Sequence, residues 1–197
     1  AMYLNVPGTM NSDSCKINGY FHGLFVRGGT ADIRNSTIVN TMDDNSLSDY
    51  FENRNWGTGN TVNLAALTLG NKNHASYNYP TNVTLTNTTI ISAGKCASDF
   101  PAIYVWANED EGKGVTVTYD NCTIDGAVIY GNNGKNIQAT VESGPVLVGD
   151  TYYLTLADAV EAVVNSESKA GTVTLLKDIT GGGIGLFNGK NGVPAEG

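Results

Sequence analysis

I-R-N-S-T-I at residues 33–38 returns as L-T-N-T-T-I at 85–90 and as Y-D-N-C-T-I at 119–124, and a fainter copy, S-C-K-I, lies at 14–17. Alternating β-prone residues precede each Asn, and a second short β-prone piece follows it. A repeated unit of this kind indicates a stacked solenoid, in which every turn of the chain adds one residue to each column. Equivalent residues of successive strands then lie about 4.8 Å apart.

The aligned copies give a corner column, a column of small side chains and an isoleucine column. They contain Ser14, Asn35, Asn87 and Asn121; Cys15, Ser36, Thr88 and Cys122; and Ile17, Ile38, Ile90 and Ile124. Asparagine tolerates the left-handed conformation of a tight turn, and stacked amides can hydrogen-bond to one another, so we expect the Asn column to form a corner. Stacked isoleucines are expected to fill the interior. Three of the four Asn-x-Ser/Thr triplets, Asn82 being the exception, belong to this corner, so stacking explains them without a glycan.

This pattern resembles the right-handed parallel β-helix of the pectate-lyase-like family, whose asparagine ladder occupies such a corner. The resemblance covers residues 12–142 and is a structural pattern without a catalytic signature. It implies an all-β solenoid for residues 1–144, with three short strands in each turn. The alternative is a β-sandwich of hairpins, which we favour less because hairpin sequences seldom repeat one column so faithfully.

The pattern changes after Gly144, and residues 145–197 form a second predicted unit. Here a short strand precedes an amphipathic helix that Thr155 can cap, and 172–176 is predicted as a strand. The phrase Y-x-x-L-x-D-A-V, followed by G-T-V-T-L-L-K-D-I-T, resembles the start of β-helix modules in large surface proteins of gut Firmicutes. The resemblance implies an extracellular, cell-surface location and a monomer within a longer tandem chain. The segment either caps the first solenoid or begins another one.

Composition limits the classes of partner. The chain of 197 residues has a net charge of −8 and only 11 Lys and Arg residues, which argues against nucleic acid binding. No apolar run approaches the length of about 18 residues that a membrane span needs.

The three cysteines are too few for a disulfide framework. Cys15 and Cys122 are interpreted as small stacking residues, and a Cys96–Cys122 pair stays open.

Catalytic residues are not predicted. Polysaccharide lyases of the resembling fold use a basic residue together with calcium-bound carboxylates. Arg27 and Arg34 are candidates by residue type, but only Asp32 falls near either of them in the repeat, so both are interpreted as lone arginines on solvated strand faces. Polygalacturonase-type hydrolases need clustered Asp residues before a Gly-His-Gly motif, whereas here His22 precedes the Asp43-Asp44 pair.

Cofactors are not predicted either, although calcium stays open. His22 and His74 are the only histidines, which excludes a histidine-rich metal centre. Two oxygen-rich loops, Asp43 to Asp49 and 108–111, have suitable chemistry for calcium, but neither has the spacing of a defined calcium loop.

Aromatic residues in the insertions between turns give the better functional signal. Insertions are predicted at 41–62, 70–81, 92–100 and 106–114, and loops on a rigid scaffold often carry function. An aromatic ring can stack on a sugar or anchor a protein interface. The alternative is that the two tryptophans only fix their own loops to the solenoid. The candidate binding residues are Tyr50, Phe51, Trp56, Tyr77, Tyr79, Trp106, Asn108 and Glu109.

These observations favour a non-catalytic adhesin or binding module of a bacterial surface protein. Its expected partner is a host glycan, such as a mucin-type sugar, or a host protein, such as an immunoglobulin. The first alternative is a carbohydrate-active enzyme, a polysaccharide lyase or glycoside hydrolase acting through Asp43, Asp44 or 109–111. The second is a structural stalk repeat without a ligand.

Overall fold

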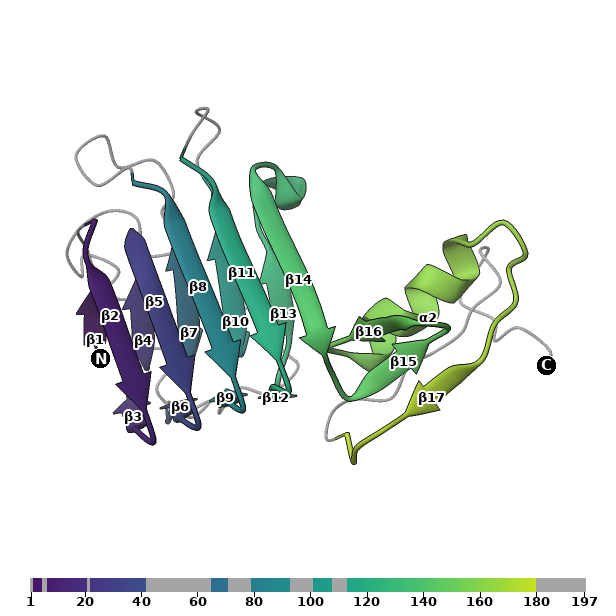
Figure 1. Cartoon of the computed structure of the whole chain (residues 1–197), viewed down its shortest axis with the longest axis horizontal. Coiled ribbons are helices and arrows are strands. Elements are labelled where there is room, and N and C mark those ends of the chain that lie inside the picture. The colour runs from purple at the N-terminus through teal and green to yellow at the C-terminus, as the bar shows by residue number, and fades with distance from the viewer. Residues whose placement is uncertain are drawn as a thin grey trace, which may run out of the picture.

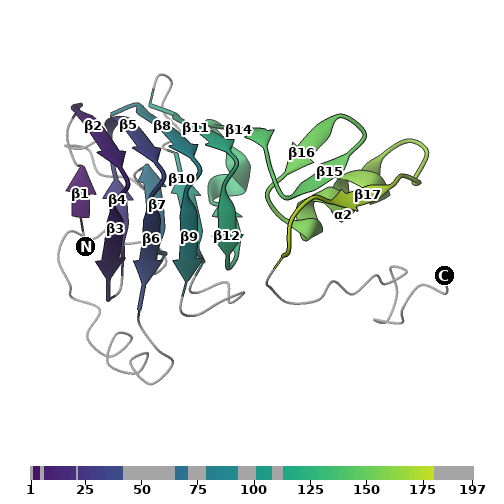
Figure 2. The same ribbon diagram turned by 60° about the horizontal axis from the view of Figure 1, so that its bottom comes forward.

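The chain forms a solenoid of parallel strands (Figure 1). The structure, a computed structural model, describes residues 2–4, 7–20, 22–41, 65–70, 79–92, 101–107 and 113–179. Sheets A, B and C form the sides of the solenoid, and a small antiparallel sheet D follows at its C-terminal end (Figure 2). The predicted all-β solenoid is confirmed, as is the single α-helix near the C-terminus within the described residues.

Each turn of the solenoid, or rung, adds one strand to each side. Sheet A contains β1 (Met2–Leu4), β4 (Leu24–Val26), β7 (Leu67–Gly70), β10 (Ile103–Trp106) and β13 (Val128–Tyr130). Sheet B contains β2 (Thr9–Asp13), β5 (Gly29–Arg34), β8 (Thr81–Thr86), β11 (Val115–Asp120) and β14 (Ile137–Ser143). Sheet C contains β3 (Lys16–Gly19), β6 (Thr37–Asn40), β9 (Thr89–Ser92) and β12 (Thr123–Asp125).

The strands pair in parallel and in the register that the repeat predicts. Leu67 pairs with Leu24 of the preceding rung and with Ile103 of the following rung. In Figure 1 the chain rises through sheet A at the back and descends through sheet B at the front as it advances from the N-terminal rung. This path is right-handed, the hand that parallel crossover connections prefer.

The asparagine column forms the corner between sheets B and C. Asn35, Asn87 and Asn121 have φ of 49°, 49° and 55°, and Ser14 in the fainter copy has 55°. The Asn121 amide donates to Oδ1 of Asn87 over 2.6 Å, and the Asn87 amide donates to Oδ1 of Asn35 over 3.2 Å. The ladder ends on charged groups, since Asn35 donates to Asp13 over 2.9 Å and Lys177 donates to Asn121.

Apolar side chains stack inside the tube. Ile38 and Ile90 pair directly and are fully buried, whereas Ile17 and Ile124 at the ends of the column are half-buried. In the small column, Thr88 donates from its hydroxyl to the carbonyls of Ile33 and Thr86, so a polar group in the core is satisfied by the backbone. The predicted interior, with stacked isoleucines beside a column of small side chains, is therefore confirmed.

The C-terminal unit packs on the last rung. Sheet D contains β15 (Val146–Val148), β16 (Thr151–Tyr153) and β17 (Val173–Leu175), and α2 (Leu156–Asn165) lies against it. A 3₁₀ turn, η2 (Asn132–Gly134), precedes β14. The predicted cap of α2 is present, because the Asp158 N–H donates to the Thr155 hydroxyl over 3.1 Å. Leu154 joins the core of the solenoid, while the division of the chain at residue 144 stays a prediction.

Candidate functional site

Two of the eight predicted binding residues, Tyr79 and Trp106, lie in the described part of the chain. The other six, Tyr50, Phe51, Trp56, Tyr77, Asn108 and Glu109, lie outside the residues that the structure describes. The described strands bracket the insertions as predicted. The first and third insertions connect sheet C to sheet A, and the second and fourth connect sheet A to sheet B. Because these strands pair with their counterparts in the next rung, each pair of insertions starts from neighbouring strand ends.

Trp106 is held firmly on the outer face of sheet A. It ends β10, in which Ile103 and Val105 belong to the core and Tyr104 and Trp106 alternate outward. The Tyr104 and Trp106 rings are stacked, with their centroids 6.2 Å apart and their planes at 16°. The indole also lies over Gly131 of the next rung, where an added Cβ would come 2.1 Å from the ring. The half-buried indole therefore has a fixed orientation.

Tyr79 lies against a different rung. A Cβ at Gly28 would come 2.8 Å from the Cβ of Tyr79, so the glycine allows this close approach. The neighbouring backbone is fixed as well, since the Gly29 N–H donates to the Pro80 carbonyl over 2.9 Å. Tyr79 is half-buried and packs beside the second rung, whereas Trp106 packs between the fourth and fifth rungs.

A buried cluster of His22, Phe25 and Arg27 was not predicted. Their exposed fractions are 6 %, 1 % and 3 %. The Arg27 guanidinium lies 4.5 Å from the Phe25 ring centroid, and the His22 ring lies 5.7 Å from the same centroid. The prediction that Arg27 lies on a solvated strand face is wrong, because its guanidinium packs on an aromatic ring and loses water. The apolar run around Leu24–Val26 was the available signal, since such runs indicate strands buried on both faces.

Burial makes His22 a poor proton carrier near neutral pH. The pKa of His22 is lowered to about 4, chiefly by desolvation and to a smaller extent by the positive charge of Arg27, while a hydrogen bond with the Ala65 backbone opposes the shift. The imidazole is therefore neutral at pH 7. This arrangement supports packing of the outer face of sheet A rather than acid–base catalysis.

Arg34 is unsuited to proton abstraction. Its Nε and Nη2 donate to the Asp32 carboxylate over 2.9 Å and 2.7 Å on the outer face of sheet B. The hydrogen bonds with Asp32 raise the pKa of Arg34, and those with Arg34 lower the pKa of Asp32. Each group is therefore held in its charged form near neutral pH.

The described cysteines are free thiols without features of a nucleophile. Cys122 is buried in the small column, donates to the Leu85 carbonyl over 3.4 Å, and has its pKa raised by desolvation. Cys15 is exposed, and Cys96 lies outside the described residues. A thiolate is the reactive form of cysteine, so the raised pKa of Cys122 disfavours reactivity.

Metal and membrane features are absent from the described segments. Among the residues that the structure describes, His, Cys, Asp and Glu form no group of three or more that could hold a metal ion. Both loops considered for calcium, 43–49 and 108–111, lie entirely outside the described residues. No described helix combines the length and apolar character that crossing a membrane requires.

Comparison with known proteins adds no relative. No protein family, curated protein or solved structure matches the chain. The structure therefore supports the parallel β-helix architecture, while the resemblance to pectate-lyase-like proteins stays a prediction from the repeat pattern.

Proposed function

We propose that the chain is a non-catalytic binding module of an extracellular bacterial surface protein of the gut Firmicutes type. It recognises a host glycan or host protein through aromatic side chains held on a rigid β-helix. The observation that carries this proposal is the partly exposed Trp106 indole at the end of sheet A, whose ring is stacked on the buried Tyr104 ring. Aromatic side chains with a fixed orientation lose little conformational entropy on binding, and tryptophan and tyrosine are frequent anchors of interfaces.

Three described features favour binding over catalysis. Arg34 is paired with Asp32, His22 is buried and neutral at pH 7, and the Cys122 thiol is buried. None of these groups is poised to take a proton or attack a substrate at neutral pH. A parallel β-helix, by contrast, holds outward side chains at fixed spacings, which suits recognition of an extended partner.

The first test is binding of the whole chain to an array of host glycans and to immobilised mucin and immunoglobulin. Trp106→Ala is compared with Tyr152→Ala, which removes a half-buried aromatic residue from sheet D. We expect Trp106→Ala to weaken binding by about tenfold or more, which corresponds to about 1.4 kcal/mol, and Tyr152→Ala to leave it unchanged. Equal binding by the parent and Trp106→Ala would contradict the proposal.

The second test separates binding from turnover. The chain is incubated with a panel of plant and host polysaccharides, and the release of reducing or unsaturated sugars is measured. We expect no release above a boiled control. Sustained release of sugars would show that the chain is a carbohydrate-active enzyme and would overturn the proposal. Failure to bind any partner would favour the alternative of a structural stalk repeat.

A further inference from the structure

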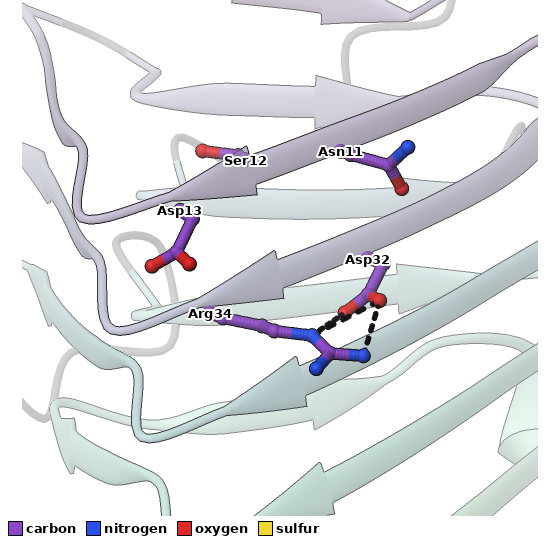
Figure 3. A pocket seen from close by; sticks show the side chains of 5 residues that line it. All are labelled: Asn11, Ser12, Asp13, Asp32 and Arg34. Carbon is purple, nitrogen blue, oxygen red and sulfur yellow. Dashed lines mark hydrogen bonds and ion pairs between the residues drawn. The ribbon is translucent and has the colours of Figure 1, made fainter.

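A shallow, open hollow lined by polar residues lies on the outer face of sheet B, away from the aromatic residues of sheet A. Figure 3 shows it between β2 and β5, with Asn11, Asp13, Asp32 and Arg34 around it and Ser12 between two of them on β2. Its volume is about 280 Å³. Pockets for drug-sized ligands measure about 300–1,000 Å³, so this hollow suits one small unit of a longer ligand.

The charged groups around the hollow are already oriented. Asp32 holds Arg34 through Nε and Nη2, so the two N–H groups of Nη1 are directed elsewhere. Oδ1 of Asp13 accepts from the Asn35 amide over 2.9 Å and from the Ser14 hydroxyl over 3.0 Å. The asparagine ladder thus fixes Asp13, and the side chains need little further ordering to bind a ligand.

The hollow offers both donors and acceptors. Nη1 of Arg34 donates, the carboxylate of Asp13 has further acceptor positions, and the exposed amide of Asn11 can do both. Vicinal hydroxyls of a sugar need this combination, because each hydroxyl donates one hydrogen bond and accepts others. A cation would use only the acceptor groups, and an anion would use only the donor groups.

The charge balance favours a neutral ligand. Two carboxylates and one guanidinium surround the hollow, and the whole chain carries a net charge of −8. Polyanionic saccharides would therefore be repelled at low ionic strength. A cation would have to compete with Arg34 for Asp32 and with Asn35 for Asp13.

The neighbouring rungs extend the polar surface along the stack. Asp32 pairs in register with Thr84, and Thr30 pairs with Asn82. Thr84 and Asn82 are exposed and uncharged, and the exposed Thr116 follows Asn82 on the next rung. Adjacent strands lie about 4.8 Å apart, so short hydroxyl and amide side chains continue for several rungs beyond the hollow.

We propose that this hollow and the adjoining face of sheet B form a second binding site, which takes a neutral polysaccharide with one sugar unit seated between β2 and β5. The choice of a glycan rests on the proposed function, while the site is separate from Trp106. Arg34 and Asn11 contact the sugar hydroxyls directly, and Asp32 acts as a positioning residue for Arg34.

The test uses ¹⁵N-labelled full chain titrated with neutral oligosaccharides of dextran, mannan and β-galactan, and with oligogalacturonate as the anionic comparison. We expect at least one neutral series to shift the backbone amides of 11–13 and 32–34. Arg34→Met and Asn11→Leu are expected to weaken this binding by about tenfold or more. Lys16→Met, which removes an exposed cation from sheet C, is the matched control and should bind like the parent.

Each outcome supports or overturns the second site. Loss of these shifts in Arg34→Met, with folding confirmed by circular dichroism, supports it. No shift with any neutral series, unchanged binding by both site variants, or tighter binding of oligogalacturonate would overturn it. Trp106→Ala separates the two proposals, since it should leave the shifts at 11–13 and 32–34 intact even where it abolishes binding to host ligands.

Discussion

Sheets A and B belong to the same rungs, but their outer faces differ in chemistry and in exposure. On sheet A, the outward residues Phe25, Thr68 and Tyr104 are at most 5 % exposed. On sheet B, the outward residues Asn82 and Thr84 are exposed. Strands pair in parallel from rung to rung in both sheets. The repeat therefore sets the rungs and the interior, whereas the outward side chains decide which sheet is covered and which is exposed to water.

The largest expected difference concerns Phe25. Phe25→Ala should lower the free energy of unfolding by about 3–5 kcal/mol, because it removes a fully buried ring under Arg27 and beside His22. Thr84→Ala on the outer face of sheet B should change it by about 0.5 kcal/mol or less. Urea unfolding followed by circular dichroism measures both. Equal effects of the two substitutions would remove the distinction between the faces.

Acid should act on the outer face of sheet A first. The pKa of His22 is lowered to about 4 in the folded chain from an ordinary value of 6.5, chiefly by burial, so the unfolded chain binds more protons between these values. The contribution of His22 is therefore complete above pH 6.5 and is lost as the pH falls toward 4, by about 3 kcal/mol in total.

The comparison of the parent with His22→Gln isolates this effect. Urea midpoints measured from pH 7 to pH 4 should fall more steeply for the parent than for the variant. Asp32 titrates in a lower window, because hydrogen bonds with Arg34 lower its pKa and its contribution is lost only as the pH falls through that lowered value. Parallel profiles of parent and variant would show that His22 does not carry the acid response.

The corner beside sheet B should depend on backbone conformation as well as on hydrogen bonds. Asn87→Ala loses the bonds to Asn35 and Asn121 and places alanine at a φ of 49°, so we expect a loss of about 2 kcal/mol. Asn87→Gly loses the same bonds but tolerates this φ, so it should be more stable than the alanine variant by about 1 kcal/mol. Thermal and urea unfolding of the pair measure the difference. Equal stability would argue against a strained corner.

The smallest effect on stability is expected at Arg34. Its ion pair with Asp32 is exposed, and such pairs contribute little. Arg34→Met should leave the urea midpoint unchanged while the pKa of Asp32 returns toward its ordinary value, as measured by an NMR titration of the carboxyl carbon. A clear fall in the midpoint would mean that the outer face of sheet B also supports the fold.

The sequence predicts sheet B better than sheet A, for a physical reason. V-T-L-T at 83–86 alternates with a period of two, which indicates one buried and one solvated face, as the structure has them. Leu24–Val26 is apolar throughout, which predicts a strand but does not identify what covers its outer face. The exposed position predicted for Arg27 is wrong for this reason. Its charge suggested contact with solvent, whereas this strand is covered on both faces.

The candidate site residues also differ in how far the sequence could predict them. Trp106 was predicted as an aromatic residue of the insertion at 106–114, and the structure places it as the last residue of β10. The bond between Arg34 and Asp32 follows from their i, i+2 spacing on one strand face, a signal available in the sequence. Lys177 at the end of the asparagine ladder could not be predicted, since its partner, Asn121, is distant in the sequence and the contact depends on how the C-terminal unit packs.

The stacking of the corner is the claim on which the rest depends, and methyl and amide NOEs test it most directly. In a chain labelled at isoleucine methyls and asparagine amides, we predict contacts from Ile38 to Ile90, from Ile90 to Ile124, and between the side-chain amides of Asn87 and its two ladder partners. Absence of these contacts, or cross-strand Hα–Hα contacts typical of antiparallel hairpins at the same residues, would contradict the β-helix.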